Sequence, residues 1–283
     1  MKINKLFFLG LFAIALFSGC KDEDITSPYD TAVSSKGGIM YDKFWATEAG
    51  FDQSNAHLVT LNAKADFFRC KQCHAWDLKG TLGSYNNRGP KTTRPNVSSI
   101  DLYAYVQGKT SQELFDGMKK TAARRDISYD LSTYNPATNS TEGDKMPNFN
   151  QLLTDAQIWD IVKFMKEGAF DVSQLYDATY TGTYPTGKTT FANIGRDGIA
   201  ADGDAFYTAN CAVCHGTDGK QIPNLDATAG MTVGKFIRSK PNELQHKIKF
   251  GQLGTAMVGE FDITQSQMKD LYKAGTNTVK YPD

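Results

Sequence analysis

Apolar residues recur every three or four positions in four stretches of the chain, which is the period of an amphipathic helix. Three of these stretches begin with a threonine that is followed three positions later by Glu or Gln, the capping-box pattern of a helix N-terminus. The three boxes are Thr110–Glu113, Thr154–Gln157 and Thr264–Gln267. The fourth stretch follows Ser239 and is ended by Gly251. The pattern therefore predicts capped helices in both halves of the chain.

Two segments lack any apolar period. Residues 126–144 are rich in Ser, Thr, Asn and Tyr and are predicted to form an insertion loop. Residues 168–203 are rich in Gly, Thr, Tyr and Asp, a composition typical of a connection between domains. On either side the chain looks like a diverged internal repeat, so we predict a first domain at 41–170, a linker at 171–199 and a second domain at 200–283.

The N-terminus has the organisation of an export signal, predicted at residues 1–19. Lys2 and Lys5 precede an apolar run that ends at Phe17, and the small residues Ser18 and Gly19 follow. The next residue, Cys20, resembles the acylated cysteine of bacterial lipoproteins, although Phe17 stands where that pattern prefers Leu. The alternative is an ordinary secretory signal followed by an unpaired cysteine.

If Cys20 is the lipid-attachment residue, the protein is exported and anchored to a membrane through its N-terminus. Polar residues 20–40 would then form a flexible tether. An acidic cluster at 21–24 resembles the signal that sends some lipoproteins to the outer face of the outer membrane. The sequence leaves open whether the protein faces the periplasm or the cell surface.

Charge excludes one class of partner. The chain has 31 basic and 31 acidic residues, and removal of Lys2 and Lys5 with the leader leaves 29 against 31. A nucleic-acid-binding protein needs a basic stripe, so we expect no nucleic acid as a partner.

The pentapeptide pattern C-x-x-C-H occurs twice, as Cys70–His74 and Cys211–His215. Cys70, Cys73, Cys211 and Cys214 are all the cysteines of the chain except Cys20. A bare C-x-x-C is also compatible with a redox dithiol or half a zinc site, but the complete motif indicates covalent attachment of a c-type haem. The histidine that follows, His74 or His215, then supplies an axial nitrogen to the iron.

With these motifs the chain resembles tandem di-haem c-type cytochromes built from two class I-like domains. The resemblance implies an all-α fold, with each domain wrapped around one of two covalently bound haems. In that family a Gly and an aromatic residue let the first helix cross the last one closely. Gly203 and Tyr207 match this pattern, whereas Asn62 and Asp66 occupy the corresponding positions before Cys70.

The resemblance also implies a sixth ligand for each iron. Met146, followed by Pro147 and lying before the last helix of its domain, has the family's ligand context. Met257 follows a glycine-punctuated loop and lies seven residues before Thr264, much as Met146 lies eight before Thr154. His246 is the rival ligand in the second domain. Met118 and Met165 are expected only to pack in the core.

In this family a proline carbonyl accepts a hydrogen bond from the second nitrogen of the axial histidine. Pro223 is the candidate in the second domain, and Pro90 and Pro95 are both candidates in the first. The basic residues of the first domain that could pair with haem propionates are Arg88, Lys91 and Arg94. An ordinary charged surface loop accounts for them equally well.

The function that follows is electron carriage between redox partner proteins, with no substrate chemistry and hence no catalytic residue. The alternative is a di-haem enzyme of the cytochrome c peroxidase or thiosulfate dehydrogenase type, with one haem open to substrate. A thiosulfate dehydrogenase would need a further cysteine as haem ligand, and only Cys20 remains. A third possibility is that one haem domain serves only to recruit a partner.

Overall fold

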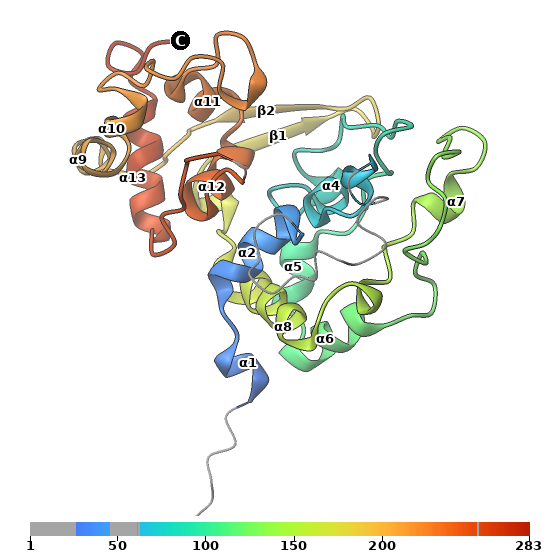
Figure 1. Ribbon diagram of the computed structural model, residues 1–283. Coiled ribbons are helices and arrows are strands. Elements are labelled where there is room, and N and C mark those ends of the chain that lie inside the picture. Colours follow the sequence, from blue (N-terminus) through green and yellow to red (C-terminus); the bar gives the residue numbers. More distant parts are fainter. Residues whose placement is uncertain (1–26, 46–60, 62, 254) are drawn as a thin grey trace, which may run out of the picture.

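The computed structural model describes residues 27–45, 61, 63–253 and 255–283 (Figure 1). The predicted export signal, Cys20 and the remaining histidine His57 lie outside these ranges. The described chain is mostly helical, which confirms the predicted fold class, and contains one two-stranded sheet. Within the same ranges no helix is long and apolar enough to cross a membrane.

The first domain consists of short helices around one apolar core. Its elements are α1 (Pro28–Thr31), α2 (Ser34–Lys43), η1 (Ala65–Phe67), α4 (Cys70–His74), η2 (Gly80–Leu82), α5 (Leu102–Gln107), α6 (Ser111–Lys119), α7 (Ser140–Gly143), η3 (Phe149–Gln151), α8 (Asp155–Lys163) and the π-helical turn η4 (Phe164–Gly168). The capping boxes predicted at Thr110 and Thr154 are both formed. Met118 and Met165 are buried in the core, as expected.

The second domain repeats this organisation in fewer residues. Its elements are α9 (Ala200–Asn210), α10 (Ala212–His215), η6 (Leu225–Ala227), α11 (Val233–Ser239), α12 (Pro241–Phe250) and α13 (Gln265–Gly275). The box at Thr264 is formed. Ser239 ends α11 and does not cap the next helix, which begins at Pro241. A proline at the first helical position lacks only an N–H that would have no intrahelical partner there.

Each domain contains one close crossing between two helices, made possible by a glycine. In the second domain α9 crosses α13, and a Cβ added to Gly203 would lie 2.0 Å from the carbonyl oxygen of Asp270. In the first domain α2 crosses α8, and a Cβ on Gly37 would lie 1.9 Å from the carbonyl oxygen of Asp160. Any side chain at either glycine would force the helices apart, so the crossing expected from Gly203 is present in both domains.

The side chains at the two crossings also correspond. The Asp160 carboxylate accepts a hydrogen bond from the Val33 amide at 2.6 Å, four residues before Gly37. The Asp270 carboxylate accepts one from the Ile199 amide at 2.7 Å, four residues before Gly203. Each aspartate thus binds the N-terminal end of the helix that crosses it. This shared detail indicates that α2 and α9 are equivalent elements of the repeat.

Helix α2 begins before residue 41, where the first domain is predicted to start. The helix begins at Ser34, inside the range 20–40 predicted as a tether, and Met40 and Tyr41 are fully buried. The sequence pattern points to a crossing helix directly before Cys70, because in the second domain Gly203 and Tyr207 stand directly before Cys211. The chain instead places Gly37 far upstream and inserts residues between α2 and the haem motif.

The predicted linker is an ordered hairpin. After the short turn η5 (Val172–Gln174), β1 (Asp177–Thr181) pairs antiparallel with β2 (Lys188–Ala192). The hairpin extends from the second domain toward the loops of the first (Figure 1). There the Gly187 amide donates to the Asn86 carbonyl at 3.3 Å, and the Thr189 hydroxyl donates to the Asn86 side chain at 2.9 Å. These polar strands form hydrogen bonds with a residue of the first domain. The local sequence pattern of the strands therefore does not predict that they are ordered.

Helix α12 belongs to both cores. Leu244 and Ile248 are buried in the core of the second domain, one helical turn apart. Phe250 is buried in the core of the first domain, where its ring lies 5.2 Å from that of Phe164. Gly38 of α2 makes room for it, because a Cβ there would lie 2.2 Å from the Phe250 ring. The two domains are therefore joined by a packed helix as well as by the hairpin.

Candidate haem-binding sites

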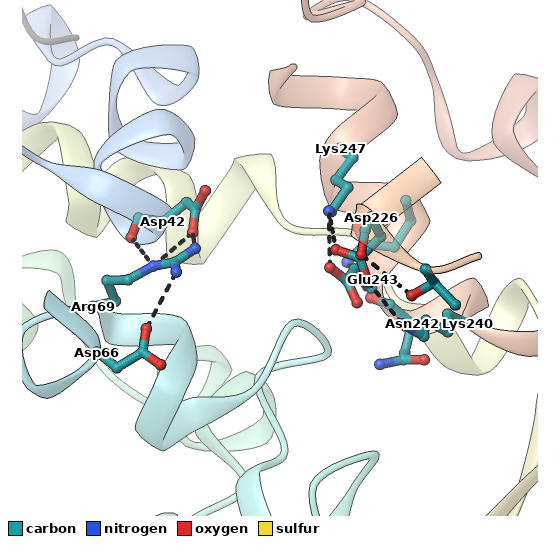
Figure 2. A network of polar contacts seen from close by, with 10 residues as sticks. Asp42, Asp66, Arg69, Asp226, Lys240, Asn242, Glu243 and Lys247 are labelled. Carbon is teal, nitrogen blue, oxygen red and sulfur yellow. Dashed lines mark hydrogen bonds and ion pairs between the residues drawn. The ribbon is translucent and has the colours of Figure 1, made fainter. Parts of the chain in front are cut away.

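The first C-x-x-C-H motif forms one isolated helical turn, α4, which places Cys70 and Cys73 three residues apart and His74 directly after Cys73. Arg69 connects this turn to α2, because its Nε donates to the Asp42 carbonyl oxygen at 3.0 Å. The same guanidinium pairs with the carboxylates of Asp42 and Asp66 (Figure 2). The helix that crosses α8 thus also holds the start of the haem motif.

The second motif forms the corresponding turn α10, which follows α9 directly at Cys211. Burial raises the pKa of the Cys70 and Cys73 thiols to about 12 and that of Cys211 to about 11. All four motif cysteines are free of disulfides. No group of three or more Cys, His, Asp or Glu suited to a metal ion occurs among the described residues.

The residue after each histidine is held in the same way. Ala75 has φ +62° and Gly216 has φ +77°, so the chain turns sharply at both positions. The Tyr41 hydroxyl donates to the Ala75 carbonyl at 2.7 Å, and the Tyr207 hydroxyl donates to the Gly216 carbonyl at 2.8 Å. Both tyrosines lie four residues after the glycine of the helix crossing. In each domain a tyrosine hydrogen bond therefore connects the crossing helix to the end of the haem motif.

Both motif histidines are suited to bind iron. Burial lowers the pKa of His74 to about 4 and also lowers that of His215, so the imidazoles are neutral at pH 7. A neutral imidazole is the form that binds metals. The Nδ1 atom of each ring is buried and has no hydrogen-bond partner. The bonds predicted to the carbonyls of Pro90, Pro95 or Pro223 are thus not formed.

The residues present fit a covalently bound c-type haem. In each domain two thiols and a neutral imidazole share one helical turn, and the first cysteine packs against the domain core. The haem would be held by thioether bonds to Cys70 and Cys73, or to Cys211 and Cys214, and by the imidazole of the following histidine.

Met146, the predicted sixth ligand of the first haem, is partly buried against the core that also contacts Cys70. Its loop is held by Arg125, which sequence patterns did not single out. The Arg125 amide donates to the Met146 carbonyl at 3.0 Å, and the Asn148 amide donates to the Arg125 carbonyl at 2.8 Å. The backbone around Met146 is thus paired like a short strand with Arg125.

The side chain of Arg125 completes this clamp. Its guanidinium donates to the carbonyl of Gly143, the last residue of α7, and at 3.3 Å to that of Lys145, directly before Met146. It also donates at 2.6 Å to the carbonyl of Phe67, three residues before Cys70. Arg125 is fully buried, and burial lowers its pKa to about 10. No motif marks such a residue, because its partners are backbone carbonyls of segments far apart in sequence.

Met257, the predicted ligand of the second haem, is partly buried against the core that contacts Cys211. The Gln252 amide donates to the Met257 carbonyl at 3.1 Å, which closes the loop between α12 and α13. Gly251 makes this closure possible: its φ is +81°, and a Cβ there would lie 2.7 Å from the Met257 carbonyl oxygen.

His246, the rival ligand, lies at the domain boundary and its ring contacts aromatic side chains of the first domain. The ring centroid is 4.9 Å from that of Trp76, 5.9 Å from Tyr41 and 5.8 Å from Phe164. Burial lowers its pKa to about 4. Its surroundings are thus those of an interface residue.

The basic residues suggested as propionate partners make contacts within their own region. Arg88 donates to the Gln72 side chain at 2.7 Å, and Arg94 donates to the Gly89 carbonyl at 2.9 Å. Lys91 and Arg94 pair through their backbones. These contacts hold the loop after the first haem motif in place.

The chain belongs to the cytochrome c family, whose sequence model matches residues 62–169 and 200–273. Each matched region contains one C-x-x-C-H turn, so the chain is a tandem cytochrome c with haem-based electron transfer as its chemistry. No curated protein and no solved structure matched the chain. The first matched region begins after α2, although α2 makes the crossing that α9 makes in the second.

Proposed function

We propose that the protein is an exported di-haem electron carrier whose two irons are each ligated by a histidine and a methionine. The observation that supports this is the same in both domains: the methionine of the loop before the last helix packs on the core that contacts the attachment cysteine. A thioether ligand raises the haem potential and closes the iron to outside molecules. Each haem would take up and release one electron, passing it between redox partner proteins.

The proposal is tested on the purified holoprotein. Two haems should remain attached after extraction with acidified acetone, and a methionine-to-ferric-iron charge-transfer band should be present for both. A high-spin ferric signal from one haem would instead favour the di-haem enzyme, because a peroxidase or dehydrogenase needs an open iron. One haem or none would refute the di-haem cytochrome altogether.

The ligand of the second haem is tested by Met257→Ala. We expect this variant to bind cyanide at one haem and to lose one charge-transfer band, because the thioether no longer occupies the iron. His246→Phe is the matched control, since it keeps an aromatic ring at the domain boundary. Loss of a ligand band in the His246 variant, with none in the Met257 variant, would make His246 the ligand.

We further propose that the protein is held at a membrane by a lipid on Cys20. The support is the n-region, the apolar run and the small residues that precede this cysteine. Cys20→Ala should move the protein from the membrane fraction to the soluble fraction with both haems retained. A variant that stays with the membrane would contradict the anchor.

A further inference from the structure

The two residues after His74 form the turn through which the first haem motif joins the rest of its domain. Ala75 and Trp76 are both buried, with exposed fractions of 0% and 3%. The corresponding residues of the second domain differ, because Gly216 is partly exposed and Thr217 is exposed. Part of what covers the first turn comes from the second half of the chain.

Helix α12 of the second domain makes the first of these contacts. The Gln245 side chain donates a hydrogen bond to the Trp76 carbonyl at 2.9 Å. The neighbouring His246 ring packs against the Trp76 ring at 4.9 Å. Gln245 and His246 have exposed fractions of 4% and 3%, so both contacts are closed to water.

The inter-domain hairpin makes the second contact. Tyr184, at the hairpin tip, packs against the apolar cluster of Ala75, Trp76, Tyr85 and Val97. Its hydroxyl donates a hydrogen bond to the Asn96 side-chain oxygen and accepts one from the Val97 amide at 3.3 Å. The next residue, Ser98, donates its amide to the Cys73 carbonyl at 2.8 Å. Tyr184 is therefore linked to the haem motif through one short loop.

Helix α12 is itself fixed in the second domain. Lys247 pairs with Glu243 at 3.0 Å and with Asp226 at 3.1 Å, and Lys240 pairs with the same Asp226 at 2.7 Å (Figure 2). Asp226 lies in η6, the short helical turn that follows the second haem motif. Although burial opposes it, the two lysines lower the pKa of Asp226, so its carboxylate is charged. Helix α12, which contacts Trp76, is thus also bound by ion pairs to the region that follows the second haem motif.

We propose that Gln245, His246 and Tyr184 are positioning residues for the first haem, so that its potential is set from across the domain boundary. They hold the Ala75–Trp76 turn and thereby the orientation of His74, and they keep water from this side of the site. The reduction potential of a haem depends on the residues that orient its ligating histidine and on how well the surroundings exclude water. The inference rests on the proposed function, because it requires a haem at His74.

The test compares single variants of the full-length holoprotein. Gln245→Leu removes the donor to Trp76, His246→Leu removes the ring, and Tyr184→Phe acts independently from the hairpin. Each should lower the midpoint potential of the first haem and change its ferric electron paramagnetic resonance signal, because water approaching the site favours the more highly charged ferric state. The potential of the second haem should stay unchanged. Cys73→Ser identifies the first haem, since loss of one thioether alters the absorbance of that haem alone.

Tyr272→Phe is the matched control. It removes the Tyr272 hydroxyl, which donates to the Pro241 carbonyl of α12 at 2.6 Å, a buried hydrogen bond of the same helix that does not involve Trp76. This variant should lose thermal stability with both potentials unchanged. If Gln245→Leu and Tyr184→Phe behave in the same way as this control, the contacts are merely structural and the inference is wrong. A protein with fewer than two haems would refute the proposed function as well, whereas two haems with unchanged potentials would refute this inference alone.

Discussion

The clamp formed by Arg125 predicts a large difference between two adjacent arginines. Arg125 is fully buried, and its guanidinium donates to three carbonyls that join the Met146 loop to the segment before Cys70. Its neighbour Arg124 is partly exposed and donates to one carbonyl, that of Gly117, at 2.8 Å. Replacing each by Met keeps the length of the aliphatic stem and removes the charge and the donors.

The magnitude follows from the hydrogen bonds lost and the charge removed. A hydrogen bond from a charged donor contributes about 1.5–3 kcal/mol, so three of them are worth about 5–9 kcal/mol. Among the described residues no carboxylate pairs with the Arg125 guanidinium. Removing such a buried cation recovers the several kcal/mol that its desolvation costs, roughly half of that sum. We therefore expect Arg125→Met to lower the free energy of unfolding by about 2–4 kcal/mol and Arg124→Met by about 1 kcal/mol or less.

The assay follows denaturant unfolding of the holoprotein by haem absorbance and, without denaturant, the methionine charge-transfer band. Arg125→Met should also weaken the band of the first haem, because the Met146 loop loses its attachment to the segment before Cys70. Equal losses of stability in the two variants, or an intact band in a destabilised Arg125 variant, would refute the role assigned to Arg125.

Two further predictions concern the helix crossing and the domain boundary. Gly37→Ala should lower the free energy of unfolding by about 3 kcal/mol, since its Cβ would lie 1.9 Å from the Asp160 carbonyl oxygen. Gly117→Ala, in a helix with nothing within 4 Å of the new Cβ, should instead stabilise by about 0.5–1 kcal/mol, and thermal unfolding of the two variants checks the contrast. Burial lowers the pKa of His246 to about 4, against the effect of nearby Asp42, so the unfolded chain takes up its proton first as the pH falls below 6.5. The contribution of His246 to the free energy of unfolding should then decrease by about 1.4 kcal/mol per pH unit between pH 6.5 and 4, and a His246→Phe variant with the same pH dependence as the unchanged protein would contradict this.

Short sequence patterns predicted the elements that are formed by residues close together in the sequence. The C-x-x-C-H turns need five consecutive residues, and the three capping boxes need a threonine and a Glu or Gln one turn later. The repeat was visible in the same way, because the loop methionines lie at nearly equal distances from the last helices. In the second domain Gly203 and Tyr207 also identified the crossing helix, since they stand close to Cys211.

The same pattern exists in the first domain, at Gly37 and Tyr41, but the sequence does not show what it packs against. Gly37 lies 33 residues before Cys70, whereas Gly203 lies eight before Cys211. Only the folded chain brings Tyr41 to the Ala75 carbonyl and so reveals the equivalence with Tyr207. The inserted residues obscured it, because spacing identifies a partner only while the intervening chain has a constant length.

The chemistry of this protein was determined by its sequence, since thiols and imidazole at fixed neighbouring positions suffice to define a haem-attachment turn. The relation between the two domains was decided by tertiary structure alone. Helix α12 has the apolar period of a helix with one buried face, yet it buries Leu244 in one core and Phe250 in the other. The hairpin residues 177–192 have the composition of a linker, yet Tyr184 packs beside the first haem motif. An amphipathic pattern shows that one face of an element is buried. Which surface covers that face depends on segments that are distant in the sequence.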